Sequence, residues 1–90
     1  MVKLRLFSKL RDIAGQKEVE VKGDGISIKE ALEKFVERFG EGSREVLFDK
    51  EGDLWPSVLL LVNGESAAKG AATQVKSGDT VAVLLPTAGG

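Results

Sequence analysis

The sequence predicts an α+β domain in which a mixed sheet of four to five strands packs on one main helix. Two segments near the N-terminus alternate apolar and charged residues with the period of a half-buried strand. Between these segments and the later apolar ones lies a segment with apolar residues at helical spacing. A helix placed between early and late strands requires a crossover, so one pair of strands is expected to be parallel. A chain of 90 residues has room for a single core of this kind.

The first two strands are expected at residues 2–7 and 17–22, where apolar residues alternate with charged ones. Residues 8–16 would form a wide connection between them, because this segment is too long for a tight hairpin. Gly23 and Gly25 then end the second strand.

The main helix is expected to begin after Ser27, because Ser27 and Glu30 have the spacing of a capping box. The apolar residues that follow form one stripe at 3.6 residues per turn. Gly40 supplies the left-handed residue that ends the helix. The stripe consists of Ile28, Ala31, Leu32, Phe35, Val36 and Phe39.

The middle of the chain carries weaker signals. Residues 41–56 are expected to be irregular, with a short turn of helix near residues 46–48 that pins the segment to the core. Within this segment, residues 49–53 would form a turn. Residues 67–72 are small and are expected to be flexible.

Two later strands complete the predicted sheet. The apolar run at residues 58–62 ends at the turn-forming pair Asn63 and Gly64, and it is typical of a buried strand. Residues 80–85 form the last strand, which Pro86 ends. The domain is therefore expected to cover residues 1–86, with a flexible tail at residues 87–90.

The composition excludes several classes of chemistry. The chain has no Cys, His or Tyr, so it cannot form a disulfide, a thiolate metal site or a Ser-His triad. The formal net charge of −1 argues against a nucleic-acid partner, which would select for a basic excess. The longest apolar run, residues 58–62, is far shorter than the ~20 residues of a membrane span. The N-terminus also lacks the apolar stretch of a signal peptide, so we expect a cytoplasmic protein without a membrane partner.

Three weak motifs are interpreted as structural. Glu33 and Glu37 could form a pair of acids for acid/base chemistry, but they alternate with basic residues on an exposed helix face. Residues 49–53 have some likeness to a calcium loop without its ligand spacing. Gly23 and Gly25 are an incomplete phosphate-binding motif. We therefore expect neither a metal site nor a bound cofactor.

Two apolar residues fall on the unexpected side of their strands. Phe7 lies on the polar side of the first strand, and Leu84 lies opposite Val81 and Val83 in the last one. Both could belong to an exposed apolar patch that docks a partner. The alternative is that each is an isolated surface residue, which is common.

The final pair, Gly89 and Gly90, indicates a carrier of a reactive terminal carbonyl. A carboxylate must be activated before it can be transferred, for instance as an acyl-adenylate, and the activated carbon must enter the active site of another enzyme. Two residues without side chains can thread a narrow channel. The alternative is an idle tail on an interaction module.

Four motifs together are typical of one family: FSKLRDIAG at residues 7–15, VNGE at 62–65, GDTVA at 78–82 and LPTAGG at 85–90. On these motifs the chain resembles, over its whole length, the small, sulfur-carrying subunit of molybdopterin synthase, a member of the ThiS/MoaD ubiquitin-like superfamily. It implies a β-grasp, ubiquitin-like fold, which agrees with the topology expected from the pattern of residues.

The resemblance also implies a function. Gly90 would be adenylated by a ubiquitin-activating-type adenylyltransferase that uses ATP, and then converted to a thiocarboxylate. The tail would enter the large subunit of molybdopterin synthase, in a heterotetramer, and supply the dithiolene sulfur of molybdopterin. The chain would then be a non-catalytic small subunit with Gly90 as its reacting residue. The expected partner contacts are Gly89, Ala88, Thr87, Pro86, Leu84 and Phe7.

Related carriers that end in two glycines imply other functions. Some serve thiamin biosynthesis or the thiolation of tRNA, and archaeal relatives also modify proteins at lysine. A small modifier of this ubiquitin-like type, or a carrier for tRNA thiolation, therefore remains an alternative to the role in molybdopterin synthesis.

Overall fold

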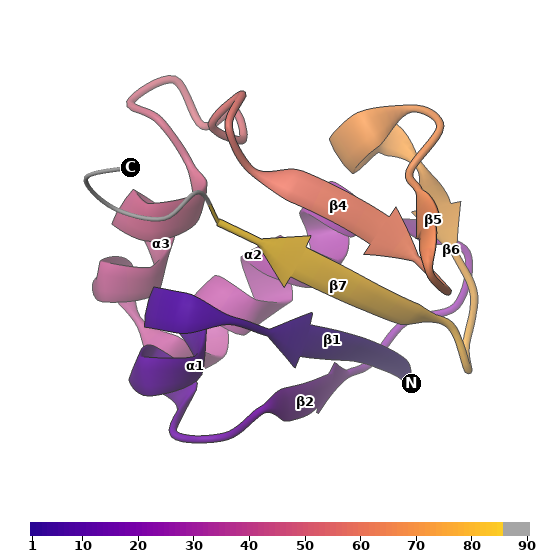
Figure 1. Cartoon of the computed structure of the whole chain (residues 1–90), viewed down its shortest axis with the longest axis horizontal. Helices are drawn as coiled ribbons and strands as arrows, with labels where there is room; N and C mark the ends of the chain where they lie inside the picture. Colours follow the sequence, from indigo (N-terminus) through magenta and orange to yellow (C-terminus); the bar gives the residue numbers. More distant parts are fainter. Residues whose placement is uncertain (86–90) are drawn as a thin grey trace.

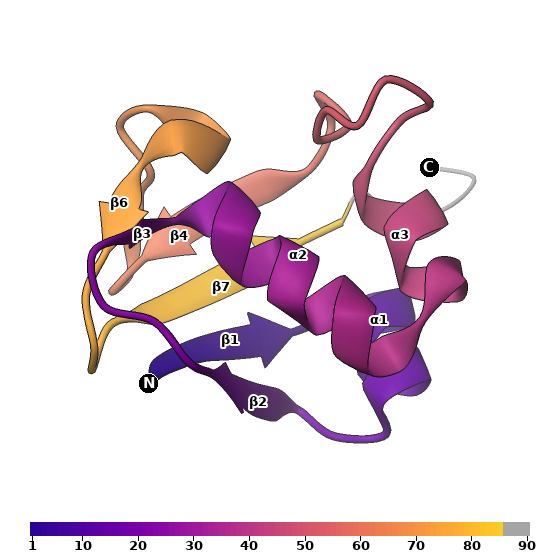
Figure 2. The ribbon, with the colours of Figure 1, turned by 180° about the vertical axis from the view of Figure 1, so that it is seen from behind.

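The computed structural model describes residues 1–85, and within them a five-stranded mixed sheet packs on one main helix. Figures 1 and 2 show this arrangement from opposite sides, with the sheet in front in Figure 1 and helix α2 in front in Figure 2. The predicted fold class is confirmed. In the order β2-β1-β7-β4-β5, the strands are Glu18–Val21, Val2–Leu6, Thr80–Leu84, Leu59–Val62 and Glu65–Ser66.

The central strand β7 is paired on both sides. It runs parallel to β1, with Leu4 opposite Val81, and antiparallel to β4, with Leu60 opposite Val83. The remaining pairs of the sheet, β1 with β2 and β4 with β5, are antiparallel. The parallel pairing of β1 with β7 agrees with the expectation that the crossover makes one pair of strands parallel.

Helix α2 covers the inner face of the sheet and spans Ile28–Phe39. Its capping box is present: the Ser27 hydroxyl oxygen accepts from the Glu30 amide at 3.1 Å, and the Glu30 carboxylate accepts from the Ser27 amide at 3.1 Å. The predicted apolar stripe is buried except for Phe39, which is half-buried and packs against the same core. Gly40 ends the helix, as predicted, and has a positive φ of 92°, but its ψ of −177° lies outside the left-handed helical region.

The connection over residues 8–16 is more regular than predicted. It contains helix α1, Ser8–Ala14, which Leu10 anchors in the core. The helix ends at Gly15, which has a φ of 72°. The segment has only Leu10, Ile13 and Ala14 as apolar residues, which is too few to reveal a helical period.

Residues 41–56 were predicted to be irregular, and this is wrong for their first half. Helix α3 covers Glu41–Leu47, so it begins earlier than the expected turn near residues 46–48. Ser43 is fully buried there, and its hydroxyl donates to the Gly40 carbonyl at 2.6 Å. Leu47 and Phe48 do pin the segment to the core, as predicted.

The strand predicted at residues 58–62 is present as β4, but the expectation that it is buried holds for only part of it. Val58 and Leu60 are buried, but Leu59 is 61% exposed, so β4 buries one face only. An uninterrupted apolar run cannot distinguish a strand buried on both faces from one that carries an apolar patch outside.

The sequence did not predict several short elements. Strands β3, Ile26–Ser27, and β6, Gln74–Val75, form a second small sheet, and the 3-10 helix η1 covers Gly70–Ala72 within the segment expected to be flexible. Elements of this length show no periodicity. No helix within residues 1–85 is long and apolar enough to cross a membrane.

Candidate functional site

The outer face of the sheet carries the candidate docking residues. Cross-strand partners share one face of a sheet, so the pairing places Arg5, Ala82 and Leu61 in one row across β1, β7 and β4. In the next row Leu84 lies opposite Leu59. This face is turned toward the viewer in Figure 1.

Phe7 and Leu84, which the sequence analysis singled out, line the same depression on this face. We name this depression of about 430 Å³ the outer hollow. Ala82 contributes only a methyl group between larger neighbours. The residues around the outer hollow are Arg5, Phe7, Glu18, Leu61, Asn63, Gly64, Thr80, Ala82 and Leu84.

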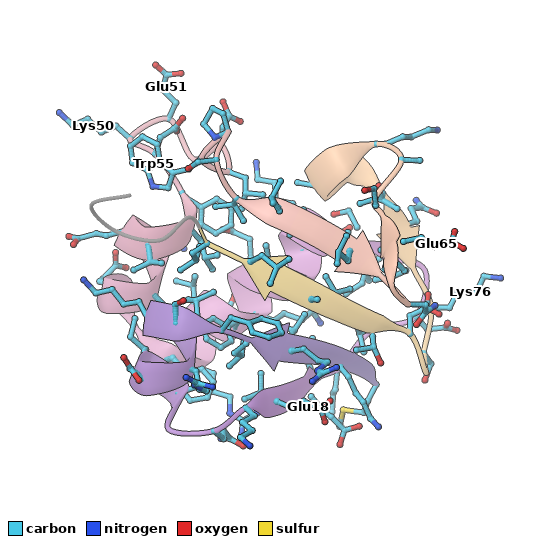
Figure 3. All side chains as sticks on the ribbon, viewed as in Figure 1. Glu18, Lys50, Glu51, Trp55, Glu65 and Lys76 are labelled. Atoms are coloured by element: carbon cyan, nitrogen blue, oxygen red, sulfur yellow. The ribbon has the colours of Figure 1, made fainter. Side chains whose placement is uncertain are left out.

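Charged groups of both signs lie beside the apolar part of the hollow. Arg5 lies 3.8 Å from the Glu18 carboxylate, and its guanidinium carbon lies 5.8 Å from the centre of the Phe7 ring. Figure 3 shows Glu18, Glu65 and Lys76 around the margin of the sheet. An apolar centre with a polar rim is the usual organisation of a protein interface.

A hydrogen-bonded turn closes the outer hollow at the end of β4. The Asn63 side-chain amide donates to Asp79 at 3.0 Å, and the Thr80 amide donates to the Asn63 side-chain oxygen at 3.0 Å. The Lys76 amide donates to the other oxygen of Asp79 at 2.8 Å. The Lys76 and Asn63 hydrogen bonds lower the pKa of Asp79 below its ordinary value of 3.8.

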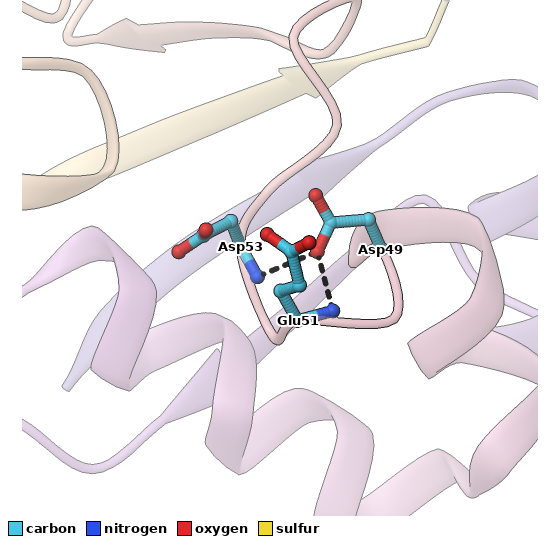
Figure 4. Close-up of side chains that lie close together, drawn as sticks. All are labelled: Asp49, Glu51 and Asp53. Atoms are coloured by element: carbon cyan, nitrogen blue, oxygen red, sulfur yellow. Dashed lines mark hydrogen bonds between the residues drawn. The ribbon is translucent and has the colours of Figure 1, made fainter.

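The turn predicted at residues 49–53 is present, and side-chain hydrogen bonds hold it. Asp49 accepts from the amides of Glu51 and Asp53 at 2.9 and 3.1 Å (Figure 4). One carboxylate oxygen from each of these three residues lies within 4.8 Å of those of the other two. Since a turn of this type accounts for the geometry, the cluster by itself does not identify a metal site.

The other acidic candidate is also explained by packing. Glu33 accepts a hydrogen bond from Arg44 of α3 at 3.2 Å, so it links two helices. The same Arg44 guanidinium lies 5.8 Å from the centre of the Phe48 ring. Glu33 is therefore held by a structural partner.

The sequence analysis missed a second depression, of about 580 Å³, beside the edge of β4. Trp55 and Leu59 line it and are 42% and 61% exposed. Trp55 is fixed by a hydrogen bond from its ring nitrogen to the Glu45 carbonyl at 3.0 Å. Two features of the sequence could have pointed to this depression, namely the single Trp and the leucine run. Neither feature predicts that the side chains are exposed.

Five of the predicted site residues lie outside the described residues: Pro86, Thr87, Ala88, Gly89 and Gly90. The roles assigned to them, and the boundary between domain and tail, stay predictions. The described part of the chain ends at Leu85, which packs against the core directly after β7. Strand β7 thus connects the outer hollow to the segment that carries the predicted reacting residue.

Comparison with known proteins decides the family, because the ThiS family model matches residues 4–90. The chain belongs to the ThiS family. It is a ubiquitin-like β-grasp domain of the ThiS/MoaD type, as the resemblance implied. Small carrier proteins of this type are not catalysts themselves.

Three similar proteins illustrate the range of the superfamily of sulfur carriers and small modifiers. Small archaeal modifier protein 1 of Haloferax volcanii is 36% identical over 87 residues, covering 96% of this chain and 97% of the relative. A chain of the Amycolatopsis orientalis BexX/CysO complex has a TM-score of 0.81 at 30% identity, with 100% of both chains covered. The putative molybdopterin converting factor subunit 1 of Pyrococcus furiosus has a TM-score of 0.72 at 28% identity, covering 96% and 97%.

The lowered pKa of Asp79 predicts a pH-dependent contribution to stability. A carboxylate with a depressed folded-state pKa stabilises the fold above its unfolded-state pKa, and this contribution is lost as the pH falls through the folded-state pKa. Asp79→Asn should therefore lower the unfolding temperature at neutral pH, and the gap to the unmodified chain should shrink below about pH 4. Thermal unfolding followed by circular dichroism measures the gap.

The matched control is Asp53→Asn, which removes an exposed carboxylate from another turn. A gap for Asp79→Asn that persists unchanged into strong acid would contradict the assigned role of the hydrogen bonds to Asp79.

Proposed function

We propose that this chain is a small protein modifier whose Gly90 carboxylate is activated and joined to lysine side chains of target proteins. The observation that carries the proposal is the 36% identity to small archaeal modifier protein 1 over nearly the full length of both chains. The match to the family model, which extends to residue 90, supports Gly90 as the reacting residue.

The proposed chemistry divides the work between this chain and its enzymes. A ubiquitin-activating-type enzyme binds ATP, and the Gly90 carboxylate attacks the α-phosphate to form an acyl-adenylate with release of pyrophosphate. A lysine amine then displaces AMP, directly or through an enzyme thioester, and the product is an isopeptide bond. This chain contributes the terminus and the surface by which enzymes hold it. Gly89 and Gly90 lack side chains that would obstruct a narrow active-site channel.

A second candidate function is sulfur transfer in molybdopterin synthesis. The likeness to a putative molybdopterin converting factor subunit favours it. In that case a sulfur donor displaces AMP, and Gly90 becomes a thiocarboxylate that delivers sulfur to the dithiolene of molybdopterin. The partner would be the large subunit of molybdopterin synthase, in a heterotetramer. Both functions share the acyl-adenylate and differ in the nucleophile that follows.

We assign the outer hollow to the docking of the activating enzyme. Phe7, Leu61 and Leu84 present an apolar surface there, and β7 leads from this surface toward Gly90. A partner that binds the hollow would bring the terminal segment close to its own ATP site. Of the expected contacts, Phe7 and Leu84 belong to this surface, whereas Pro86, Thr87, Ala88 and Gly89 would line the channel.

Conjugation to lysine is tested by mass spectrometry of cells that lack deconjugating enzymes. The unmodified chain should leave its terminal residues on target lysines after protease digestion. Deletion of Gly89 and Gly90 should abolish these conjugates. Gly42→Ala is the matched control, because an added Cβ meets open space there, and it should conjugate normally.

The same experiment separates the two candidates. A chain that forms no conjugates, but whose intact mass shows one oxygen replaced by sulfur, would contradict the modifier function and support sulfur transfer. A deletion variant that conjugates as well as the unmodified chain would contradict both.

Leu84→Asp should weaken recognition by the activating enzyme. Burial of a leucine side chain at an interface contributes about 1.5–3 kcal/mol, so we expect at least a tenfold rise in the KM for this chain in ATP–pyrophosphate exchange. Circular dichroism establishes that the variant is folded. The matched control, Ala68→Asp, places the same charge at an exposed position that does not line the hollow. Equal KM values for the two variants would contradict the assignment.

A further inference from the structure

We propose that Asn63 and Gly64 form a site of spontaneous deamidation, and that Asp79 and Thr80 restrain this reaction in the folded chain. Asn63 is the only asparagine of the sequence, and it is followed by glycine in the turn between β4 and β5. Both residues have positive φ angles, 52° and 87°, and both are exposed. The site is therefore open to water and carries no side chain at its second residue.

The reaction needs only these two residues and water. The Gly64 backbone nitrogen loses its proton to solvent and attacks Cγ of Asn63, and the side-chain nitrogen leaves as ammonia. The resulting five-membered succinimide is opened by water at either carbonyl. The products are aspartate or isoaspartate, and no oxidant or reductant is involved.

The attacking atom is free in the folded chain. Within residues 1–85 the Gly64 amide donates no hydrogen bond, and a Cβ added to Gly64 would meet nothing within 4 Å. The similar pair Asp24 and Gly25 offers a contrast, because the Gly25 amide donates to the Val75 carbonyl at 2.8 Å. Of these two pairs, only Asn63 and Gly64 have a backbone nitrogen that is free to attack.

The electrophilic carbon of the reaction, Cγ of Asn63, belongs to a side chain that two hydrogen bonds hold in place. The Asn63 side chain donates to Asp79 and accepts from the Thr80 amide, each at 3.0 Å. A rotation of the Asn63 side chain toward the Gly64 nitrogen would break both hydrogen bonds. The contact with Asp79 involves a charged acceptor, which makes it the stronger of the two. Asp79 is therefore a positioning residue that slows the reaction.

Deamidation would change both the turn and the outer hollow. An aspartate at position 63 would place a second carboxylate beside Asp79, where like charges repel. Isoaspartate would add a methylene to the main chain of a two-residue hairpin turn and disturb the register of β4 with β5. Asn63 and Gly64 line the outer hollow, so the modification would also alter the proposed docking surface. This last consequence rests on the proposed function, whereas the rate of deamidation does not.

The test measures deamidation of the full chain during incubation at mildly alkaline pH, by peptide mapping with mass spectrometry. We expect slow deamidation at Asn63 in the folded chain and fast deamidation in denaturant. Asp79→Ala should accelerate the reaction of the folded chain about tenfold, the typical effect of losing one hydrogen bond to a charged group. Asp53→Ala, which removes a carboxylate from a different turn, should leave the rate unchanged.

Circular dichroism establishes that each variant is folded under the incubation conditions. If Asp79→Ala does not fold, Asp79→Asn takes its place, because its single acceptor oxygen cannot hold the amides of both Asn63 and Lys76. Faster modification of either folded variant supports the proposal. Equal rates for the folded variant and the unmodified chain would overturn it, as would equal rates for the folded and denatured chains.

Discussion

The position of β7 between β1 and β4 is the constraint on which the rest of the structure depends. Since side chains alternate along a strand, a single register decides which residues of β7 reach the core and which reach the outer face. Val81 and Val83 are fully buried against the α2 side, and Ala82 and Leu84 lie on the opposite side. A shift by one residue would exchange the two sets, so the core and the outer hollow are fixed together.

This constraint also connects the fold to the proposed chemistry. The sheet and α2 form one packed unit. The sequence contains no Cys or His, which are common nucleophiles, bases and metal ligands. What this unit does provide is a recognisable face, connected through β7 to the segment that carries the predicted reacting residue. A terminus that is activated by other enzymes needs such a face, because those enzymes have little else to recognise in two glycines.

The sequence predicted the parts of the fold in which pattern and length agree. The stripe on α2, its capping box and the alternation in β1 and β2 each repeat often enough to identify an element. Helix α1 and the strands β3, β5 and β6 are too short for a period, and tertiary contacts such as the burial of Leu10 determine them. The exposure of Leu59 could not be predicted, because an uninterrupted apolar run has no alternation that would assign its residues to one face or the other.

Only some residues of the candidate site could be predicted from the sequence. Phe7 and Leu84 are apolar residues on a polar side, which marks them in the sequence, whereas Arg5, Leu61 and Ala82 join them only through the pairing of β1, β7 and β4. Nuclear magnetic resonance of the labelled chain, titrated with its activating enzyme, tests this account most directly. The account predicts that amide signals from Phe7, Leu61, Ala82 and Leu84 shift or broaden, while those of Lys34 and Glu37 on the solvent side of α2 stay in place. Perturbation of α2 with an unchanged outer face would contradict it.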